Sequence, residues 1–429
     1  MNILAYIVWL DDTVGQQNRK SKAVLSIFLP GEVTFMRVHV ISTYVPAKCG
    51  IAEYASDLVK ALENIGVKVN VIAVDQGVEH LTYPSNVSYV IKRDSERDYI
   101  EAAEYVNSED ADVVLVQHEY GIFGGRWGCH LLRFMEKVDA PLVTTLHTVI
   151  PPLDDFMDEV TQRILELSNV TTVMSRGSLR VLHECYDIDG CDVRIVPHGV
   201  RFIQTEGKDY IKAKLGISNR FVMSTIGFLS SNKGIEYAIM ALPKIKRYVS
   251  NILYLIVGTV HPKQKQTHGD SYYERLVNLA EDLKVKDQVL FINAFPEKEN
   301  YVRYIVASDV IVLPYTNEMQ VSSGFLAHAL SYGKAIVSTP FVHAKDLLSN
   351  GRGLLCKFKD PDSVADAVIK LAGDPDLRAE IEAKALRYGL RFKWENVAEV
   401  LLRIFMEASL RREKTYVIPA YAQESQRIY

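Results

Sequence analysis

Short apolar segments alternate with amphipathic segments along almost the whole chain. Residues 37–43 (RVHVIST) are rich in β-branched side chains, as expected for a buried strand. In the segment that follows, 52–66, apolar residues recur at helical spacing: Tyr54, Leu58, Leu62 and Ile65. Strands that alternate with helices are typical of a parallel sheet covered by helices on both faces, because each connection must cross over the sheet. The pattern predicts a doubly wound α/β fold.

The alternation occurs in two series, which a charged stretch near 201–220 separates. Strands of the first series are predicted at 37–43, 68–74, 111–121, 141–148, 170–175 and 193–199. Strands of the second series are predicted at 221–228, 252–258, 288–293, 309–315, 335–339 and 353–358. Two series in 429 residues indicate two domains of ordinary size. Ligands bind beyond the carboxyl ends of the strands in such folds, so polar residues after each strand are the site candidates.

The predicted domain boundaries follow from this division. We expect an extension at 1–35, a first domain at 36–205, a second domain at 206–392, a C-terminal helix at 393–412 that crosses back to the first domain, and a tail at 413–429. The extension is either an added strand or a sequence upstream of a start at Met36. Its apolar run lacks a basic flank and a small-residue cleavage site, and no stretch of the chain reaches the roughly 18 apolar residues of a membrane span, so neither a signal peptide nor a transmembrane helix is expected.

Composition excludes several classes of protein. The chain is 48% hydrophobic and 24% charged, which predicts a packed globular protein, and its net charge of −4 gives no reason to expect nucleic acid as a partner. The five cysteines are scattered and form no CxxC pair. Neither a disulfide framework nor a zinc site is supported, and a reducing cytoplasmic compartment fits best.

Candidate ligand-binding residues follow three strands of the first series. Gly50 lies between a loop and a helix, where a backbone without a side chain lets an anion approach the free N–H groups of the helix start. His118 and His147 each stand at the carboxyl end of a strand, and His198 lies close to the proposed domain junction. The alternative is an ordinary turn with structural histidines, but two histidines at the carboxyl ends of separate strands favour a shared cleft.

The second series offers a lysine and a serine-rich turn. Lys233 is expected at the start of a helix, where a cation opposes the helix dipole but suits a bound diphosphate; the alternative is a surface lysine. Ser322, Ser323 and Gly324 fall at another predicted helix start. A serine there serves as an N-cap or helps to hold a phosphate, and this segment alone does not separate the two roles.

Taken together, these stretches resemble the retaining glycosyltransferases of family four. The resemblance runs from about Met36 to the helix at 394–405 and rests on motifs in the family's order: CGIAEYASDL, TTLHT, IVPHGV, IGFLSSNKGIEYAI, DVIVLPY and SSGFLAHALSYGKAIVST. YVPAKCGIAEYASDL with QHEYGIFGG is most similar to the mannosyltransferase-like subgroup. The resemblance implies the GT-B fold, in which two Rossmann-like domains face each other across a cleft. The donor then binds mainly to the second domain and the acceptor to the first, without a metal or a cofactor other than the nucleotide-sugar co-substrate.

The resemblance also implies a mechanism and a set of site residues. The sugar is transferred on one face with retention of configuration, and the leaving diphosphate helps to deprotonate the acceptor hydroxyl. Implied catalytic residues are His147, His118 and Lys233. Implied donor-binding residues are Gly50, Gly227, Lys233, Gln320, Ser322, Ser323, Gly324 and His328. Negative charge grows on the diphosphate during transfer, and Lys233, the backbone near Gly50 and the amides around Ser323 and Gly324 are expected to oppose it.

Two departures from the family pattern stand out. Phe228 occupies the position of an arginine that usually lies five residues before the motif lysine. Gln320 and His328 occupy the positions of two glutamates that usually hold the sugar and ribose hydroxyls. Neutral side chains still bond hydroxyl groups, but less strongly than ionised ones. Glu318, two residues before Gln320, is an alternative partner if the loop shifts.

The leading hypothesis is transfer of mannose from GDP-mannose to a carbohydrate or lipid-linked acceptor. UDP-glucose and UDP-N-acetylglucosamine are alternative donors, since the phosphate contacts would be the same. A different class of protein, a weakened binding or partner subunit, is suggested by the missing glutamates and arginine. A lipid-linked acceptor would bring the protein into peripheral contact with the inner face of the membrane, although the short basic stretch 408–414 is expected to be a solvated face.

Overall fold

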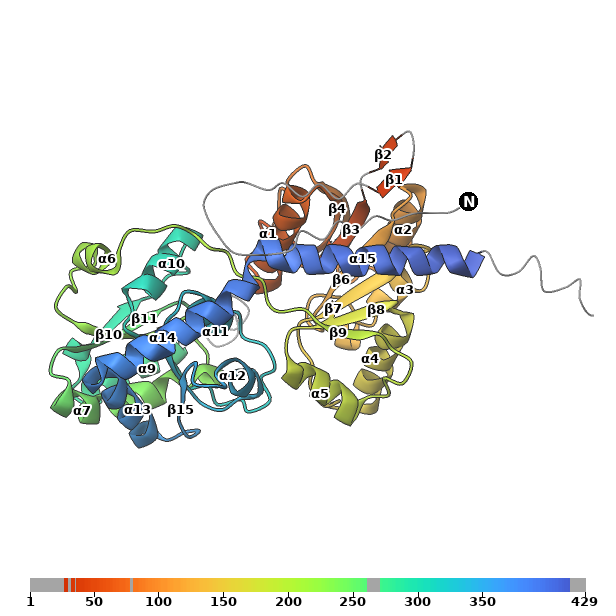
Figure 1. Ribbon diagram of the computed structural model, residues 1–429. Helices are drawn as coiled ribbons and strands as arrows, with labels where there is room; N and C mark the ends of the chain where they lie inside the picture. The colour runs from red at the N-terminus through yellow and green to blue at the C-terminus, as the bar shows by residue number, and fades with distance from the viewer. Residues whose placement is uncertain (1–26, 30–31, 35, 78–79, 261–270, 417–429) are drawn as a thin grey trace, which may run out of the picture.

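The computed structural model describes residues 27–29, 32–34, 36–77, 80–260 and 271–416. The expected extension at 1–35 is therefore described only in part, as the antiparallel pair β1 (Ile27–Leu29) and β2 (Glu32–Thr34). The tail expected at 413–429 lies outside the described residues beyond Tyr416. Within the described residues, two α/β domains lie side by side (Figure 1).

The first domain is built on a seven-stranded parallel sheet. In spatial order its strands are β5 (Val87–Lys92), β4 (Lys68–Asp75), β3 (Arg37–Ser42), β6 (Val113–His118), β7 (Leu142–Leu146), β8 (Val170–Val173) and β9 (Val193–Ile195). Its helices are α1 (Gly50–Asn64), α2 (Glu96–Ser108), α3 (Leu131–Met135), α4 (Asp155–Leu167) and α5 (Arg176–Cys185), with a 3-10 turn η1 (Arg126–Gly128). The sequence reading missed β5, an edge strand of mostly exposed or half-buried residues without a continuous apolar run.

The second domain is built on a six-stranded parallel sheet. In spatial order its strands are β12 (Val289–Ile292), β11 (Ile252–Val257), β10 (Phe221–Ile226), β13 (Val310–Leu313), β14 (Ala335–Ser338) and β15 (Leu354–Leu355). Its helices are α6 (Lys208–Lys214), α7 (Ile235–Tyr248), α9 (Ser271–Asp282), α10 (Lys298–Ala307), α11 (Gly324–Ser331), α12 (Val342–Leu347), α13 (Pro361–Gly373) and α14 (Pro375–Gly389), with 3-10 turns η2 (Ser231–Lys233), η3 (Lys286–Gln288) and η4 (Leu390–Phe392).

Both sheets are buried on their two faces, as parallel sheets with crossover helices require. Every residue of the central strands β6, β11 and β13 is buried, and separate apolar clusters lie on the two sides of each sheet. The prediction of two doubly wound domains is confirmed. Because all strands of one sheet run the same way, their carboxyl ends gather at one edge, and the site candidates gather there with them.

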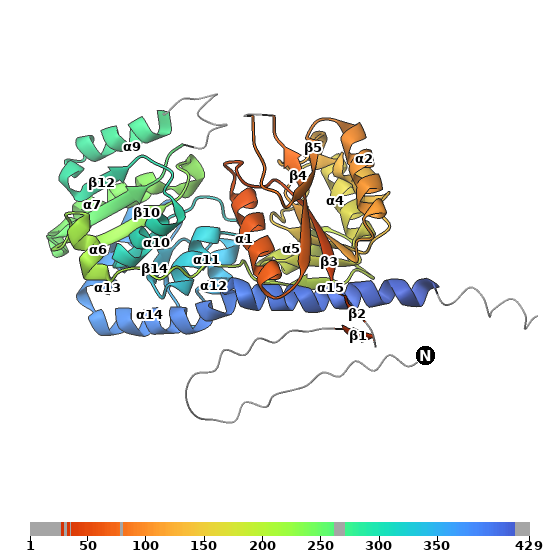
Figure 2. The same ribbon diagram turned by 90° about the horizontal axis from the view of Figure 1, so that it is seen from above.

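The chain passes between the domains twice, and the two passages touch. The N–H of Val200 donates to the carbonyl of Phe392 at 2.6 Å, and Val200 forms an isolated bridge with Lys393. The long helix α15 (Trp394–Tyr416) then lies along the first domain, with its apolar residues packed in the cluster that holds α1 (Figures 1 and 2). The last helix of the chain thus contributes to the core of the first domain.

Gly199 marks the closest packing at this junction. A Cβ atom added at Gly199 would overlap the indole ring of Trp394. We expect Gly199→Ala to lower the free energy of unfolding by about 1–3 kcal/mol, the usual cost of inserting a methyl group into a packed core. Urea unfolding followed by circular dichroism measures this, with Gly373→Ala as the control, since a Cβ at Gly373 meets no atom within 4 Å. An unchanged midpoint for Gly199→Ala would contradict the packing.

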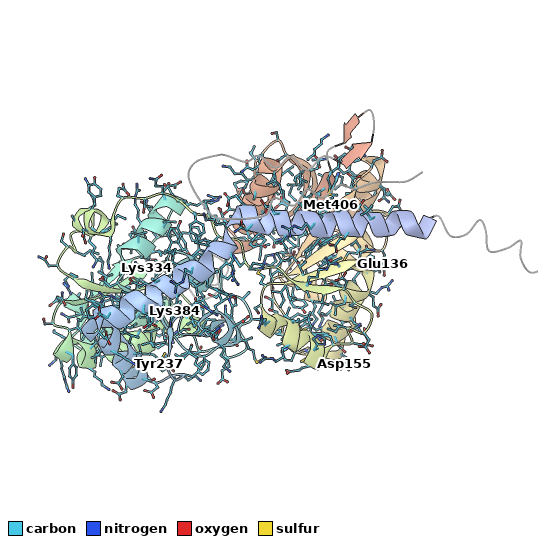
Figure 3. All side chains as sticks on the ribbon, viewed as in Figure 1. Glu136, Asp155, Tyr237, Lys334, Lys384 and Met406 are labelled. Atoms are coloured by element: carbon cyan, nitrogen blue, oxygen red, sulfur yellow. The ribbon has the colours of Figure 1, made fainter. Side chains whose placement is uncertain are left out.

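Lys334, labelled in Figure 3, belongs to the framework rather than to a ligand site. It follows the Gly333 turn and precedes β14, so it lies at the amino end of that strand, the opposite edge from the carboxyl ends. Its ammonium donates to the carbonyl of Val306 at 3.2 Å, and burial lowers its pKa to about 8. This lysine therefore has a structural role.

Candidate active site

A cavity of about 760 Å3 lies where the carboxyl ends of the two sheets face each other. Its first-domain wall comes from the start of α1 and the ends of β6 and β7, and its second-domain wall from the loop after β12, from α10 and from α11. Figure 2 shows α1 at the face of the first domain that is turned toward the second. Five of the site residues that the family resemblance implies line the cavity: Gly50, His147, Ser322, Gly324 and His328. His198, which the sequence placed near the domain junction, lines it as well.

Gly50 is the first residue of α1 and opens the helix toward the cavity. Cys49 holds the N-cap position without a side-chain capping bond. A Cβ added at Gly50 would meet no atom within 4 Å. The N–H groups of a first helical turn have no partner within the helix, and they carry the positive end of the helix dipole. The geometry leaves room for an anion to reach this turn.

His147 is fixed as a neutral imidazole. Its Nε2–H donates to the side-chain oxygen of Gln117 at 2.7 Å, which leaves Nδ1 as the acceptor. Its ring meets Tyr54 edge to face, with centroids 4.7 Å apart. Burial lowers the pKa of His147 to about 3, with smaller contributions from His198 and His118. The side chain therefore offers a hydrogen-bond acceptor and no charge at neutral pH.

His118 lies behind the cavity wall. The side chain is fully buried, stacks on Phe123 at 6.1 Å, and is not among the residues that line the cavity. Neither ring nitrogen has a hydrogen-bond partner among the described residues, and burial lowers its pKa to about 4. Its carbonyl accepts the N–H of His147 at 3.0 Å. The structure thus connects His118 to the site through the backbone, whereas the sequence placed its ring on the same wall as His147.

His198 joins His328 in the cavity. His198 is outside the set of site residues predicted from the sequence, although it was noted near the junction. Its Nδ1–H donates to the carbonyl of Gly199 at 2.7 Å, and that of His328 donates to the carbonyl of Gly324 at 2.8 Å. The two rings are 6.2 Å apart, and Tyr301 meets His328 edge to face at 5.4 Å. Burial lowers both pKa values to about 4, so these imidazoles are also neutral.

The serine turn before α11 connects the two domains. The hydroxyl of Ser322 donates to the carbonyl of His147 at 2.8 Å. Ser323 is the N-cap: its Oγ accepts from the N–H of Leu326 at 3.3 Å, and its own N–H donates to Nδ1 of His343 at 2.9 Å. This corrects the expectation that the amide of Ser323 is free to oppose a phosphate. Ser322 and Gly324 line the cavity, whereas Ser323 between them does not.

Gln320 lies in the same loop but outside the cavity lining. Its side-chain N–H donates to the carbonyl of Ser322 at 2.9 Å. Glu318, the alternative partner, is exposed. In this conformation Gln320 braces its own loop, so contact with a sugar requires that its side chain turn away from Ser322.

Lys233 lies just before α7 rather than at its start. It ends the turn η2, and Gly234, with a φ of 60°, separates it from the helix. Its ammonium lies 4.0 Å above the ring of Tyr315, a cation–π contact, and it is not among the cavity-lining residues. The N–H of Thr316 donates to the carbonyl of Asn232 at 3.0 Å and so holds the turn against the loop after β13.

Gly227 lies at the end of β10, on the same edge of the sheet. Its φ of 127° is in the region that favours glycine, and a Cβ there would meet no atom within 4 Å. It is not among the cavity-lining residues. The turn from Gly227 to Lys233 therefore borders the cavity rather than forming its wall.

Charged residues that the sequence reading missed cross the mouth of the cavity. Lys298 of α10 forms ion pairs with Glu53 at 2.5 Å and with Asp57 at 3.3 Å, both on α1. Arg201 of the linker also pairs with Asp57. The spacing of Glu53 and Asp57, one turn apart on a helix, is the only sequence signal for this cluster, and it does not reveal a partner from another domain.

A carboxylate lies next to His147 on the first-domain wall. Glu119 follows β6 and lines the cavity, and the hydroxyl of Thr148 donates to its Oε2 at 2.5 Å. Burial raises its pKa, while Thr148 and the N–H groups of Tyr120 and Gly121 act in the opposite direction. An ionisable group kept in a cavity wall at a desolvation cost is typical of functional sites.

Comparisons with known proteins agree with this architecture. Residues 49–202 match the family described as "Glycosyltransferase Family 4", and residues 207–387 match "Glycosyl transferases group 1". The chain belongs to glycosyltransferase family 4. The two matches meet at the linker, so each domain carries its own part of the family pattern.

Relatives in the family differ in the acceptor that their names give. The chain is 30% identical over 258 residues to a D-inositol 3-phosphate glycosyltransferase of Corynebacterium jeikeium, a match of 57% of this chain and 59% of that protein. It is 21% identical over 395 residues to a phosphatidyl-myo-inositol mannosyltransferase of Mycolicibacterium smegmatis, covering 87% and 94%. The chain spans less than two thirds of the length of the first inositol phosphate relatives that it matches.

Solved structures of glycosyltransferases share the fold. Anabaena HepE in complex with UDP-glucose superposes with a TM-score of 0.68 at 16% identity, covering 87% of this chain and 100% of that one. The GT-B fold expected from the sequence is confirmed. In the parts of this chain that the structure describes, no helix is long and apolar enough to cross a membrane, and no three His, Cys, Asp or Glu side chains gather as metal ligands.

Proposed function

We propose that this family 4 protein is a hexosyltransferase that moves a sugar from a nucleoside diphosphate to a hydroxyl acceptor with retention of configuration. The observation that carries the proposal is the cavity between the two sets of strand ends, where the open first turn of α1 faces His328 and the Ser322 turn of the second domain. A cavity between two domains suits a reaction of two substrates, with the donor bound to one domain and the acceptor to the other.

The donor that we propose is GDP-mannose. The mannosyltransferase relative, which the chain matches over 87% of its length, supports mannose. UDP-glucose is the second candidate, because the structurally similar HepE was solved with it. The acceptor proposed is a carbohydrate or a lipid-linked molecule with a free hydroxyl group. A lipid-linked acceptor would bring the protein to the membrane surface.

The residues that we assign to the reaction act by opposing charge and by orienting the sugar. Negative charge that grows on the leaving diphosphate is opposed by the first turn of α1 and by Lys233, once its ammonium leaves the ring of Tyr315. His147, held neutral, accepts a hydrogen bond from a sugar hydroxyl through Nδ1. The acceptor proton passes to the leaving diphosphate, so none of the neutral imidazoles has to carry it.

The test is nucleoside diphosphate release from GDP-mannose, UDP-glucose and UDP-N-acetylglucosamine, with and without a panel of sugar acceptors. We expect GDP release that an acceptor accelerates, and a product whose one-bond C1–H1 coupling in NMR shows the same anomeric configuration as the donor. Preferential release of UDP would mean that the donor is UDP-glucose or UDP-N-acetylglucosamine rather than GDP-mannose. A purified protein that neither binds nor turns over any of the three would indicate a binding or partner subunit instead.

Gln320→Glu tests the assignment of the donor loop. A carboxylate cannot donate to the carbonyl of Ser322, so the side chain is released toward the donor, and it offers a charge-assisted bond to a sugar hydroxyl. We expect donor affinity to rise by about 2- to 10-fold. Calorimetry with GDP-mannose measures the donor affinity. The control is Asn317→Asp in the same loop, because the Oδ1 of Asn317 accepts from the N–H of Met319 and an aspartate keeps that acceptor. Equal affinity of the wild type and Gln320→Glu would remove Gln320 from the donor site.

A further inference from the structure

The loop after β12 carries an aromatic ring whose exposure the fold does not explain. Phe295 is 55% exposed, although it is a large apolar side chain, and it lines the mouth of the cavity. Its inner neighbour is Phe228, with the two rings 5.0 Å apart and 27° from parallel. Phe228 is the residue that replaces the family's usual arginine. An aromatic ring that faces a cavity and is supported from behind by a second ring can stack against a flat ring of a ligand.

The same loop touches both places where the proposed nucleotide is anchored. Phe228 lies at the end of β10, on the turn that leads to Lys233 and to the proposed diphosphate contacts. Tyr301, one helical turn beyond Glu297 on α10, meets the ring of His328, the residue that the family resemblance assigns to the ribose hydroxyls. The segment 295–299 lines the cavity beside these two proposed anchors.

Glu297 presents a carboxylate beside this aromatic surface. It lines the cavity, is exposed, and occupies the N-cap position of α10 without making a side-chain capping bond. The next residue, Lys298, also lines the cavity, and its ammonium pairs with Glu53 and Asp57 on α1. The carboxylate of Glu297 is thus the acidic group nearest in sequence to the exposed ring, and its lysine neighbour is engaged elsewhere.

We propose that Phe295 stacks on the donor's base and that Glu297 selects guanine. The inference rests on the proposed function and adds the residues that choose the nucleotide. A carboxylate only accepts hydrogen bonds, and guanine offers it two adjacent donors, N1–H and the N2 amino group. Uracil offers one N–H between two carbonyl oxygens, which a carboxylate repels. A base stacked on Phe295 turns its hydrogen-bonding edge outward, where Glu297 can reach it.

Calorimetry with GDP, UDP and inosine diphosphate tests the two roles separately. We expect the wild type to bind GDP more tightly than inosine diphosphate, which lacks the N2 amino group, and more tightly than UDP. Glu297→Gln should lower the preference for GDP over UDP by roughly 5- to 150-fold, the effect of one bidentate base contact. Phe295→Ala should weaken GDP and UDP alike by a similar factor, because stacking does not depend on the base's edge. Phe295→Tyr, which keeps the ring, should bind as the wild type does.

The control for charge is Glu399→Gln, an exposed glutamate of α15 outside the cavity. If Glu297→Gln binds GDP tightly and keeps the wild-type ratio of GDP affinity to UDP affinity, the inference is overturned and the proposed function stands. A wild type that binds inosine diphosphate as tightly as GDP leads to the same conclusion. A wild type that prefers UDP overturns the inference together with GDP-mannose as the proposed donor, and leaves only the proposed sugar transfer standing. Failure of all three diphosphates to bind overturns the proposed function together with the inference.

Discussion

At pH 5 the protein is expected to be less stable to urea than at pH 8. Five histidines have strongly lowered pKa values. His118, His147 and His343 are buried, and His198 and His328 are half-buried in the cavity wall. Burial lowers their pKa values from 6.5 to about 3 or 4. In the unfolded chain the same side chains titrate near 6.5.

The sign of the effect follows from this difference. Above pH 6.5 the histidines are neutral in both states, so the free energy of unfolding keeps its full value. As the pH falls from 6.5 toward 4, the unfolded chain binds protons that the folded protein does not, and stability falls. At pH 5 each imidazole accounts for about 2 kcal/mol. Urea unfolding between pH 8 and 4.5 measures the slope.

His118→Phe isolates one of these contributions. The His118 ring already stacks on Phe123, and its two nitrogens lack partners among the described residues, so a phenyl ring suits the site. We expect this variant to lose about 2 kcal/mol less than the wild type between pH 8 and pH 5. His183→Phe, at an exposed position of α5, should leave the slope unchanged. Equal slopes for all three proteins would show that burial does not hold His118 neutral.

Lys233→Ala is expected to lower kcat/KM for the donor by about 10²- to 10³-fold, the usual cost of removing one group that opposes charge in the transition state. Phe228 stands where the family resemblance implies an arginine, so the turn after β10 carries one cation, Lys233, and we expect the rate to depend strongly on it. Steady-state release of the nucleoside diphosphate measures the loss. Lys233→Arg, which keeps the charge but not the shape of the ammonium, should retain part of the rate.

Lys244→Ala is the matched control for Lys233. Lys244 lies further along α7 and pairs with Asp362 and Asp366 on the outside of the domain. Its removal should leave kcat/KM unchanged. Circular dichroism should show both variants folded, since the contact of Lys233 with Tyr315 is a single cation–π pair. A rate for Lys233→Ala within twofold of the wild type would place the phosphate contacts elsewhere.

The sequence predicted the fold well because its signals are local. Strand and helix periodicity, together with glycine at turns, identified both sheets and the edge at which ligands bind. It missed β5, which as an edge strand has no continuous apolar run. Gly50, His147 and His328 were predicted because each follows from a motif position, and the cavity contains all three.

The direction of side chains was beyond the reach of sequence patterns. His118 and His147 end neighbouring strands with the same kind of signal, yet one ring packs behind the wall and the other forms part of it. The N–H of Ser323 donates to Nδ1 of His343, and the side-chain N–H of Gln320 donates to the carbonyl of Ser322 in its own loop. The pairs of Lys298 and Arg201 with α1 join residues that are far apart in the chain.

The sequence by itself determined two doubly wound domains and the family, because both depend on periodicity and on motifs within short segments. Only the tertiary structure decided which polar groups are free to meet a ligand. That depends on what each group touches across the junction of the two domains, and on burial, which keeps the histidines of the cavity neutral. The exposure of the Phe295 ring near Glu297 is also decided by the tertiary structure, since a loop sequence does not show that its aromatic residue faces a cavity.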